Sequence, residues 1–151
     1  MIGKHVRRII RYATLGVLAA LVVPMSVLAA DATIQPTTAT LVAKGAAVDV
    51  TVSFTCPAGD VLGGPFGYNA ILLYVEQAVS KTSLATGSTQ GGNGITCTGS
   101  PQSTDLIVPA NPPGPPFRTG PALVSASLFA CDAMNNCVNA SSAPTTIRVT
   151  K

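Results

Sequence analysis

Residues 47–56, AVDVTVSFTC, decide the fold of this chain. From Val48 to Cys56, every second position holds an apolar side chain or the cysteine, and the positions between them hold Asp, Thr or Ser. A period of two built from β-branched and aromatic residues is typical of a strand with one buried face and one solvated face. Pro57 ends the segment, because proline cannot donate a hydrogen bond to a ladder. The stretch predicts a β protein.

Working outward from this segment, six further stretches carry strand-like patterns. They are residues 32–42, 70–78, 102–110, 122–131 and 145–150, and a short β segment that reaches Cys97. Segment 70–78 is apolar on both faces, which predicts a central place in a sheet. Turn residues separate the stretches, and no helical period or repeat is present. Seven short strands predict an all-β fold, an immunoglobulin-like two-sheet sandwich, with a barrel as the main alternative.

Two connections are too rich in glycine or proline to form a ladder. Residues 57–69 form a long glycine-rich connection that holds Phe66 and Tyr68. Residues 111–121, NPPGPPFRTGP, predict an extended, polyproline-like connection. We expect Phe117 to insert from this second connection into the core.

The first thirty residues predict a signal peptide. A basic start precedes the apolar run 12–28, and Ala29 and Ala30 provide the small residues that a signal peptidase reads. Cleavage there leaves residues 31–151 as a single secreted domain. An uncleaved anchor helix is the alternative, although the run is barely long enough to cross a bilayer and Pro24 lies near its end.

Removing the signal peptide changes the charge of the protein. The full chain carries a formal charge of +3, whereas residues 31–151 keep five basic and six acidic side chains, a net charge of −1. No basic patch remains that would attract phosphate backbones or acidic lipid. We therefore expect no nucleic-acid partner, and no membrane association after signal cleavage.

All four cysteines follow the signal peptide, and an even number in a short exported chain predicts two disulfides. In a sandwich of strands that alternate in direction, Cys56, Cys97, Cys131 and Cys137 fall at one end, which we call the cysteine pole. We favour the pairs Cys56–Cys97 and Cys131–Cys137. The pairing Cys56–Cys131 with Cys97–Cys137 stays open. A zinc site is not expected, because the spacings are wide and His5, the only histidine, leaves with the signal.

Residues 31–151 lack the groups of common catalytic sites. A Ser-His-Asp or Cys-His site needs a histidine, the acids are too scattered for glycoside hydrolysis, and no phosphate-binding glycine motif is present. We expect no enzymatic activity and no cofactor. Asp132, Asn135, Asn136 and Asn139 suggest a weak calcium site, but turn formation explains them as well, so no metal is expected.

Four motifs resemble those of small uncharacterised exported immunoglobulin-like proteins of actinobacterial type. They are C-P-A-G-D (56–60), T-C-T-G (96–99), P-F-R-T-G-P-A (116–122) and C-x₅-C (131–137). Segment 126–150 looks like the last hairpin of bacterial immunoglobulin-like domains. A remoter likeness is to the neocarzinostatin-type apoproteins, exported sandwiches with two disulfides that carry a small molecule. The first resemblance implies an exported sandwich and brings no function with it.

Together these features predict a secreted, non-catalytic module that recognises an unknown ligand or cell-surface partner at the cysteine pole. Rigid scaffolds that carry long loops are where binding sites tend to lie. The candidate contacts are Phe66, Tyr68, Asn135 and Asn136, unless Phe66 caps the core and Tyr68 begins a strand. A structural or envelope-associated protein without a specific ligand is one alternative function, and a small-molecule carrier is another.

Overall fold

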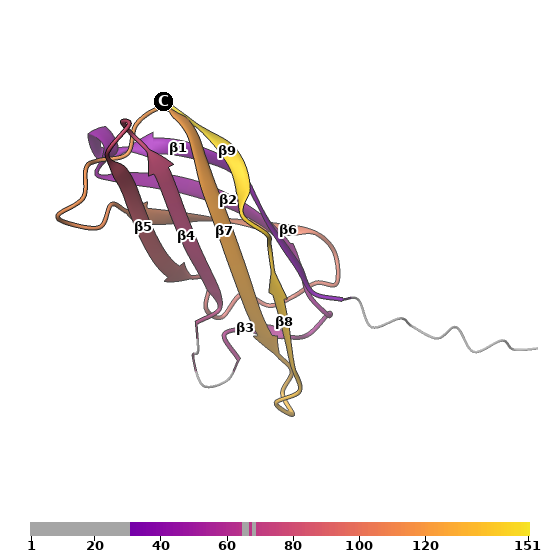
Figure 1. The fold of residues 1–151 in the computed structure, drawn as a ribbon. Helices are drawn as coiled ribbons and strands as arrows, with labels where there is room; N and C mark the ends of the chain where they lie inside the picture. Colours follow the sequence, from indigo (N-terminus) through magenta and orange to yellow (C-terminus); the bar gives the residue numbers. More distant parts are fainter. Residues whose placement is uncertain (1–30, 65–66, 68) are drawn as a thin grey trace, which may run out of the picture.

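The computed structural model describes residues 31–64, 67 and 69–151 (Figure 1). Within these ranges the elements are β1 (Thr33–Val42), the short 3-10 helix η1 (Ala43–Gly45), β2 (Ala47–Thr55), β3 (Val61–Leu62), β4 (Ile71–Ala78), β5 (Leu84–Gly91), β6 (Gln102–Pro109), β7 (Gly120–Cys131), β8 (Cys137–Ser141) and β9 (Thr145–Thr150). The predicted signal peptide, residues 1–30, lies outside the described ranges. None of the helices in those ranges has the length and apolar character needed to cross a membrane.

The strands join into one nearly closed sheet, which confirms the all-β prediction. Their order is β5-β4-β7-β9-β1-β2-β6, and β3 and β8 each pair with β7 beside this path. All pairs are antiparallel except β1 with β9. In Figure 1, β4, β5 and β7 lie in front, and β2 and β6 cross behind them. The two ends of the path, β5 and β6, meet through a bridge between Gly87 and Ala110.

The count of seven strands predicted from the sequence is too low, because the described part of the chain holds nine. Residues 80–98 lack a clear pattern, yet they contain the whole of β5, whose sequence is LATGSTQG. The segment that reaches Cys97 contributes only an isolated bridge between Thr96 and Val61. Strand β5 was missed because its residues are small or polar, and such residues carry little intrinsic preference for a strand.

The core is built from the inward faces of β2, β4 and β7. The predicted alternation of β2 is confirmed, since its apolar positions are almost completely buried. The largest fully buried side chains are Phe54, Phe117, Leu62, Ile71, Leu73 and Leu128 and the valines 48, 50, 52, 75, 108 and 124. Full burial of each such side chain is worth about 1.5–3 kcal/mol, so these three strands supply most of the apolar stabilisation.

The seam between β5 and β6 depends on glycine. A Cβ atom added at Gly87 would collide with the carbonyl oxygen of Pro109, and one added at Gly91 would collide with a methyl group of Leu106. The amide of Asn111 donates a hydrogen bond of 2.8 Å across the seam to the carbonyl of Thr86. Two glycines thus allow β5 to approach β6 closely enough to close the sheet.

Phe117 inserts into the core as predicted, with 1% of its surface exposed. Its amide donates a hydrogen bond of 2.8 Å to the carbonyl of Gly45. The neighbouring Arg118 exchanges two hydrogen bonds of 2.7 Å with the buried side-chain amide of Gln77, through its backbone N–H and carbonyl. The proline-rich connection is therefore fixed to η1 on one side and to β4 on the other.

Replacement of Phe117 by alanine should lower the free energy of unfolding by about 3–5 kcal/mol, because it leaves a cavity where the seam meets the core. Phe117→Leu keeps part of the apolar volume and should cost less. Urea denaturation followed by circular dichroism measures both changes. The matched control is Ile107→Ala at an exposed position, which should change stability by no more than about 0.5 kcal/mol. A loss at Phe117→Ala no larger than this control would contradict the assignment.

Candidate functional site

Both predicted disulfides are present, Cys56–Cys97 and Cys131–Cys137. The alternative pairing is therefore wrong. The two bonds lie at the same end of the molecule, since Val61 of β3 pairs with Cys131 on one side and with Thr96 on the other. In Figure 1 this end contains β3, β8 and the tip of the β7 arrow.

The cysteine pole is held by covalent bonds and by backbone hydrogen bonds together. The first disulfide closes a loop with a sequence separation of 41 residues, which in the chain-entropy picture stabilises the fold by about 3–4 kcal/mol. Strand β3 adds hydrogen bonds from its Leu62 amide to the carbonyl of Ile95 and from the Cys97 amide to the carbonyl of Asp60. The pole is a rigid frame.

Asp132, Asn135 and Asn136 form the turn between β7 and β8. Asn135 takes the left-handed conformation, with φ of 62°, which asparagine tolerates better than most residues. The Asp132 carboxylate accepts hydrogen bonds of 2.7–2.8 Å from the Met134 amide and from both the amide and the side chain of Asn136. The side chain of Asn136 thus stabilises the turn. A ligand contact of Asn135 or Asn136 stays a prediction.

The other two candidate contacts of the pole, Phe66 and Tyr68, lie outside the described residues. The turn around Asp132 also bears on the weak calcium site that its side chains suggest. Within the described ranges, no group of three or more His, Cys, Asp or Glu side chains is placed to hold a metal ion. Recognition at the cysteine pole therefore stays a prediction.

Two carboxylates face each other where β3 meets β7. The register pairs Val61 with Cys131, so continuation of the ladder by one residue sets Asp60 opposite Asp132. Asp60 is 7% exposed, and its carboxylate has no hydrogen-bond partner among the described residues. Burial, and secondarily the charge of Asp132, raises the pKa of Asp60. The pKa of Asp132 is lowered, chiefly by the hydrogen bond from the side chain of Asn136.

These opposite pKa shifts give opposite pH dependences. The folded chain holds a proton at Asp60 more tightly than the unfolded chain, so the stability from Asp60 is complete below the ordinary pKa of 3.8 and is lost as the pH rises through the raised value. The stability from Asp132 is present above 3.8 and is lost as the pH falls through the lowered value. Ionisation of Asp60 therefore destabilises the fold relative to its protonated form.

Asp60→Asn should raise the melting midpoint at pH 7, because it removes a buried charge opposite Asp132. The gain should shrink as the pH is lowered and wild-type Asp60 takes up its proton. Thermal unfolding of both proteins between pH 3 and pH 8 measures this. Asp105→Asn, at an exposed position on β6, is the control and should show no such trend. A gain that grows toward acid pH would refute the assignment.

A second candidate site lies on the outer surface of β4 and β7, which we call the β4–β7 face. It consists of the outward residues Leu72, Tyr74, Glu76 and Ala78 of β4 and Pro121, Leu123, Ser125 and Ser127 of β7, with Leu84 of β5 beside them. Strand alternation produces it, because Ile71, Leu73 and Val75 point into the core. Tyr74, Leu84 and Leu123 are 52%, 51% and 45% exposed, three of the five large exposed hydrophobic side chains in the described ranges.

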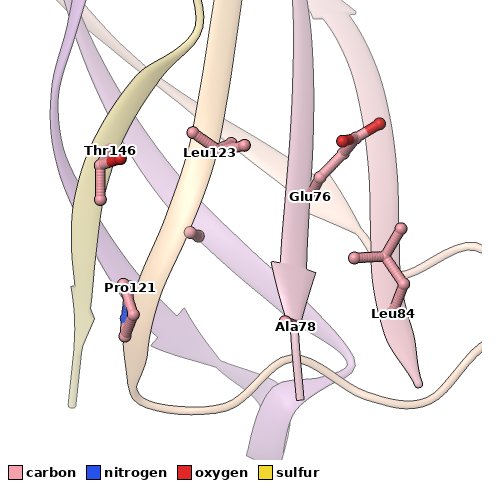
Figure 2. Close-up of a pocket in the computed structure, with 7 residues that line it drawn as sticks. Glu76, Ala78, Leu84, Pro121, Leu123 and Thr146 are labelled. Atoms are coloured by element: carbon pink, nitrogen blue, oxygen red, sulfur yellow. The ribbon is translucent and has the colours of Figure 1, made fainter. Parts of the chain in front are cut away.

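Three adjoining hollows run along the β4–β7 face. The largest, about 340 Å³, is lined by Glu76, Ala78, Leu84, Pro121, Ala122, Leu123 and Thr146 (Figure 2). The second, about 250 Å³, is lined by Tyr74, Glu76, Leu123, Ser125 and Pro144. The third, about 200 Å³, shares Tyr74 and Ser125 with the second. Because neighbouring hollows share residues, they form one shallow groove.

Glu76 is the only acidic side chain that lines this groove in the described structure. The sheet register places it between Leu123 of β7 and Thr86 of β5. Figure 2 shows Glu76 and Leu123 on neighbouring strands, with Leu84 beyond Glu76 and Thr146 beyond Leu123. No described residue forms an ion pair or hydrogen bond with the Glu76 carboxylate. An apolar groove with one unpaired carboxylate is suited to binding by apolar burial and by charge.

The sequence indicates this face through the apolar residues of segment 70–78. Apolar residues on both faces of segment 70–78 predicted a central strand, and β4 does lie between β5 and β7. A central place in the sheet leaves open whether other elements cover the second apolar face. In the described structure Tyr74 is half exposed. The residues were visible in the sequence, but their exposure was not.

Comparison with known proteins adds no relative. No family model matches the chain, and neither the curated proteins nor the solved structures compared with it give a match.

Proposed function

We propose that the chain is an exported, non-catalytic, immunoglobulin-like module that recognises a ligand through its β4–β7 face. The strand order supports the sandwich. Strands β1, β2 and β6 follow one another in the positions of A, B and E of an immunoglobulin domain, and β9, β7, β4 and β5 in those of G, F, C and C′.

The strand pairing supports two layers as well. The two halves join through only two residue pairs between β1 and β9 and one bridge at Gly87. Pairing inside the halves is longer, with eight residue pairs between β2 and β6 and six between β4 and β7. Thin junctions between well-paired halves are what a sandwich has, whereas a barrel pairs its strands evenly around the ring.

Two features support export. The sequence begins with a predicted signal peptide. The domain carries two disulfides, which persist in oxidising compartments and are rare in the cytosol.

The observation that carries recognition is the exposed apolar groove of the β4–β7 face. Large contiguous apolar patches on soluble proteins often mark binding sites, and the exposed apolar side chains here share one groove. The two larger hollows, at about 340 and 250 Å³, are near the lower end of the range for small-molecule sites. Their size favours a small ligand. A recognition module and a small-molecule carrier would therefore use the same groove. Rigid strands that end in the cross-linked pole hold the groove in shape.

A thermal-shift screen of a small-molecule library tests the function. A ligand of this groove should raise the melting midpoint of the secreted protein. At a ligand concentration of a hundred times the Kd, the free energy of unfolding should increase by about 2.7 kcal/mol. The rise should disappear in the double variant Tyr74→Ser/Leu123→Ser, which removes the two largest apolar side chains of the second hollow.

Ile107→Ser is the matched control for the screen, since it removes an equally exposed hydrophobic residue on β6, in the other half of the sheet. Ligand responses should survive this change. A screen whose hits persist in the double variant would place recognition elsewhere on the molecule, and a screen with no hits would favour the structural alternative.

A further inference from the structure

The geometry of the β4–β7 face points to a ligand class, and we propose that this face binds a small organic cation, an ammonium group on an apolar body, with Glu76 as its counter-ion. The proposal rests on the recognition function above and names the chemistry of that same site. Three observations carry it: the position of Glu76 in the groove, its lack of a partner, and the side chains around it.

Glu76 lines both of the larger hollows, and so does Leu123. A ligand placed in either hollow therefore lies beside the carboxylate. The polar side chains around it are hydroxyls, Thr146 in the first hollow and Ser125 in the second. A negatively charged ligand would meet repulsion at this position, whereas an ammonium group would meet a charge-assisted hydrogen bond.

No described cation neutralises the Glu76 carboxylate. Arg148 lies opposite Pro121 on β9, and it is separated from β4 by the whole of β7. It forms no ion pair with Glu76. A ligand that covers the groove partly removes water from the carboxylate, so the ligand itself must bring the compensating charge.

The remaining side chains suit the rest of an organic cation. Tyr74 lies two residues before Glu76 on the same outward face, and its ring can attract an ammonium group through a cation–π interaction. Leu84, Pro121 and Leu123 provide apolar walls. A second copy of the chain would bring the same Glu76 to the face, and like charges across a contact repel, so it fits less well than a cation.

Amide NMR titration of the ¹⁵N-labelled secreted protein tests the proposal with three compounds that share one ring. The compounds are 2-phenylethylammonium, 2-phenylethanol and phenylacetate. We expect the ammonium compound to shift the amides of residues 74, 76 and 123 and to bind about tenfold more tightly than the alcohol. Phenylacetate should bind most weakly. The preference for the cation should fade in 1 M NaCl, where screening acts over about 3 Å.

Glu76→Gln should abolish the preference for the cation and leave the binding of the alcohol nearly unchanged. Asp105→Asn removes a carboxylate from β6 and should preserve the preference, which controls for the net charge of the protein. Tyr74→Leu keeps an apolar side chain and should lose only part of the preference.

The outcomes separate the two proposals. Equal binding of all three compounds at the same amides would overturn the cation proposal and leave recognition by the groove intact. A cation preference that survives Glu76→Gln would overturn it too. If no compound shifts these amides, the cation proposal fails, while the library screen decides the function. Self-association that Leu123→Ser abolishes would show that a second copy occupies the face, against the proposal.

Discussion

The contact between β5 and β6 is the constraint on which the rest of the structure depends. Gly87 lies against the carbonyl of Pro109 and against Val108 and Phe117, with no room for a side chain. The inward faces of β2, β4 and β7 share one core, and Phe117, which lies against Gly87 at the seam, belongs to it. Outside this core, Tyr74, Leu84 and Leu123 stay about half exposed. Ligand binding is the role that we propose for these side chains.

The molecule divides its tasks between an end and a face. At the cysteine pole, two disulfides and the short β3 fix the ends of β2 and β7. This end also contains a destabilising feature, the buried Asp60 opposite Asp132, which the cross-links are able to offset. The β4–β7 face lies along β4 and β7, which run from the cysteine pole to the end of the molecule where the chain terminates (Figure 1). A rigid support for a shallow groove limits the entropy that a ligand must overcome on binding.

Much of this architecture follows from local sequence patterns. Strand β2 was predicted because alternation is a property of the segment itself, and the disulfide pairing followed from the order of strands. The insertion of Phe117 followed from a lone aromatic residue among prolines. Strand β5 was not predictable in the same way, because its place depends on how Gly87 and Gly91 fit against distant residues. Contacts of this kind join residues far apart in the sequence, so they produce no hydrophobic period within the strand itself.

The candidate site was predictable only in part. The apolar outward residues of β4 were visible, but a pattern cannot distinguish a face covered by other elements from one that is open. The burial of Asp60 was equally hidden, because an aspartate after a Pro-Ala-Gly turn is expected to be solvated. Phe66 and Tyr68, the contacts predicted for the pole, lie outside the described residues and stay predictions.

Amide hydrogen exchange at Asn111 tests the central claim most directly. This amide donates to the carbonyl of Thr86 across the seam and belongs to no strand, so only closure of the sheet can protect it. The account predicts that Asn111 exchanges far more slowly than an open loop, in step with the amides of β5. Exchange at the rate of an unfolded chain, with the β2 and β4 amides still protected, would show an open sheet and contradict the account.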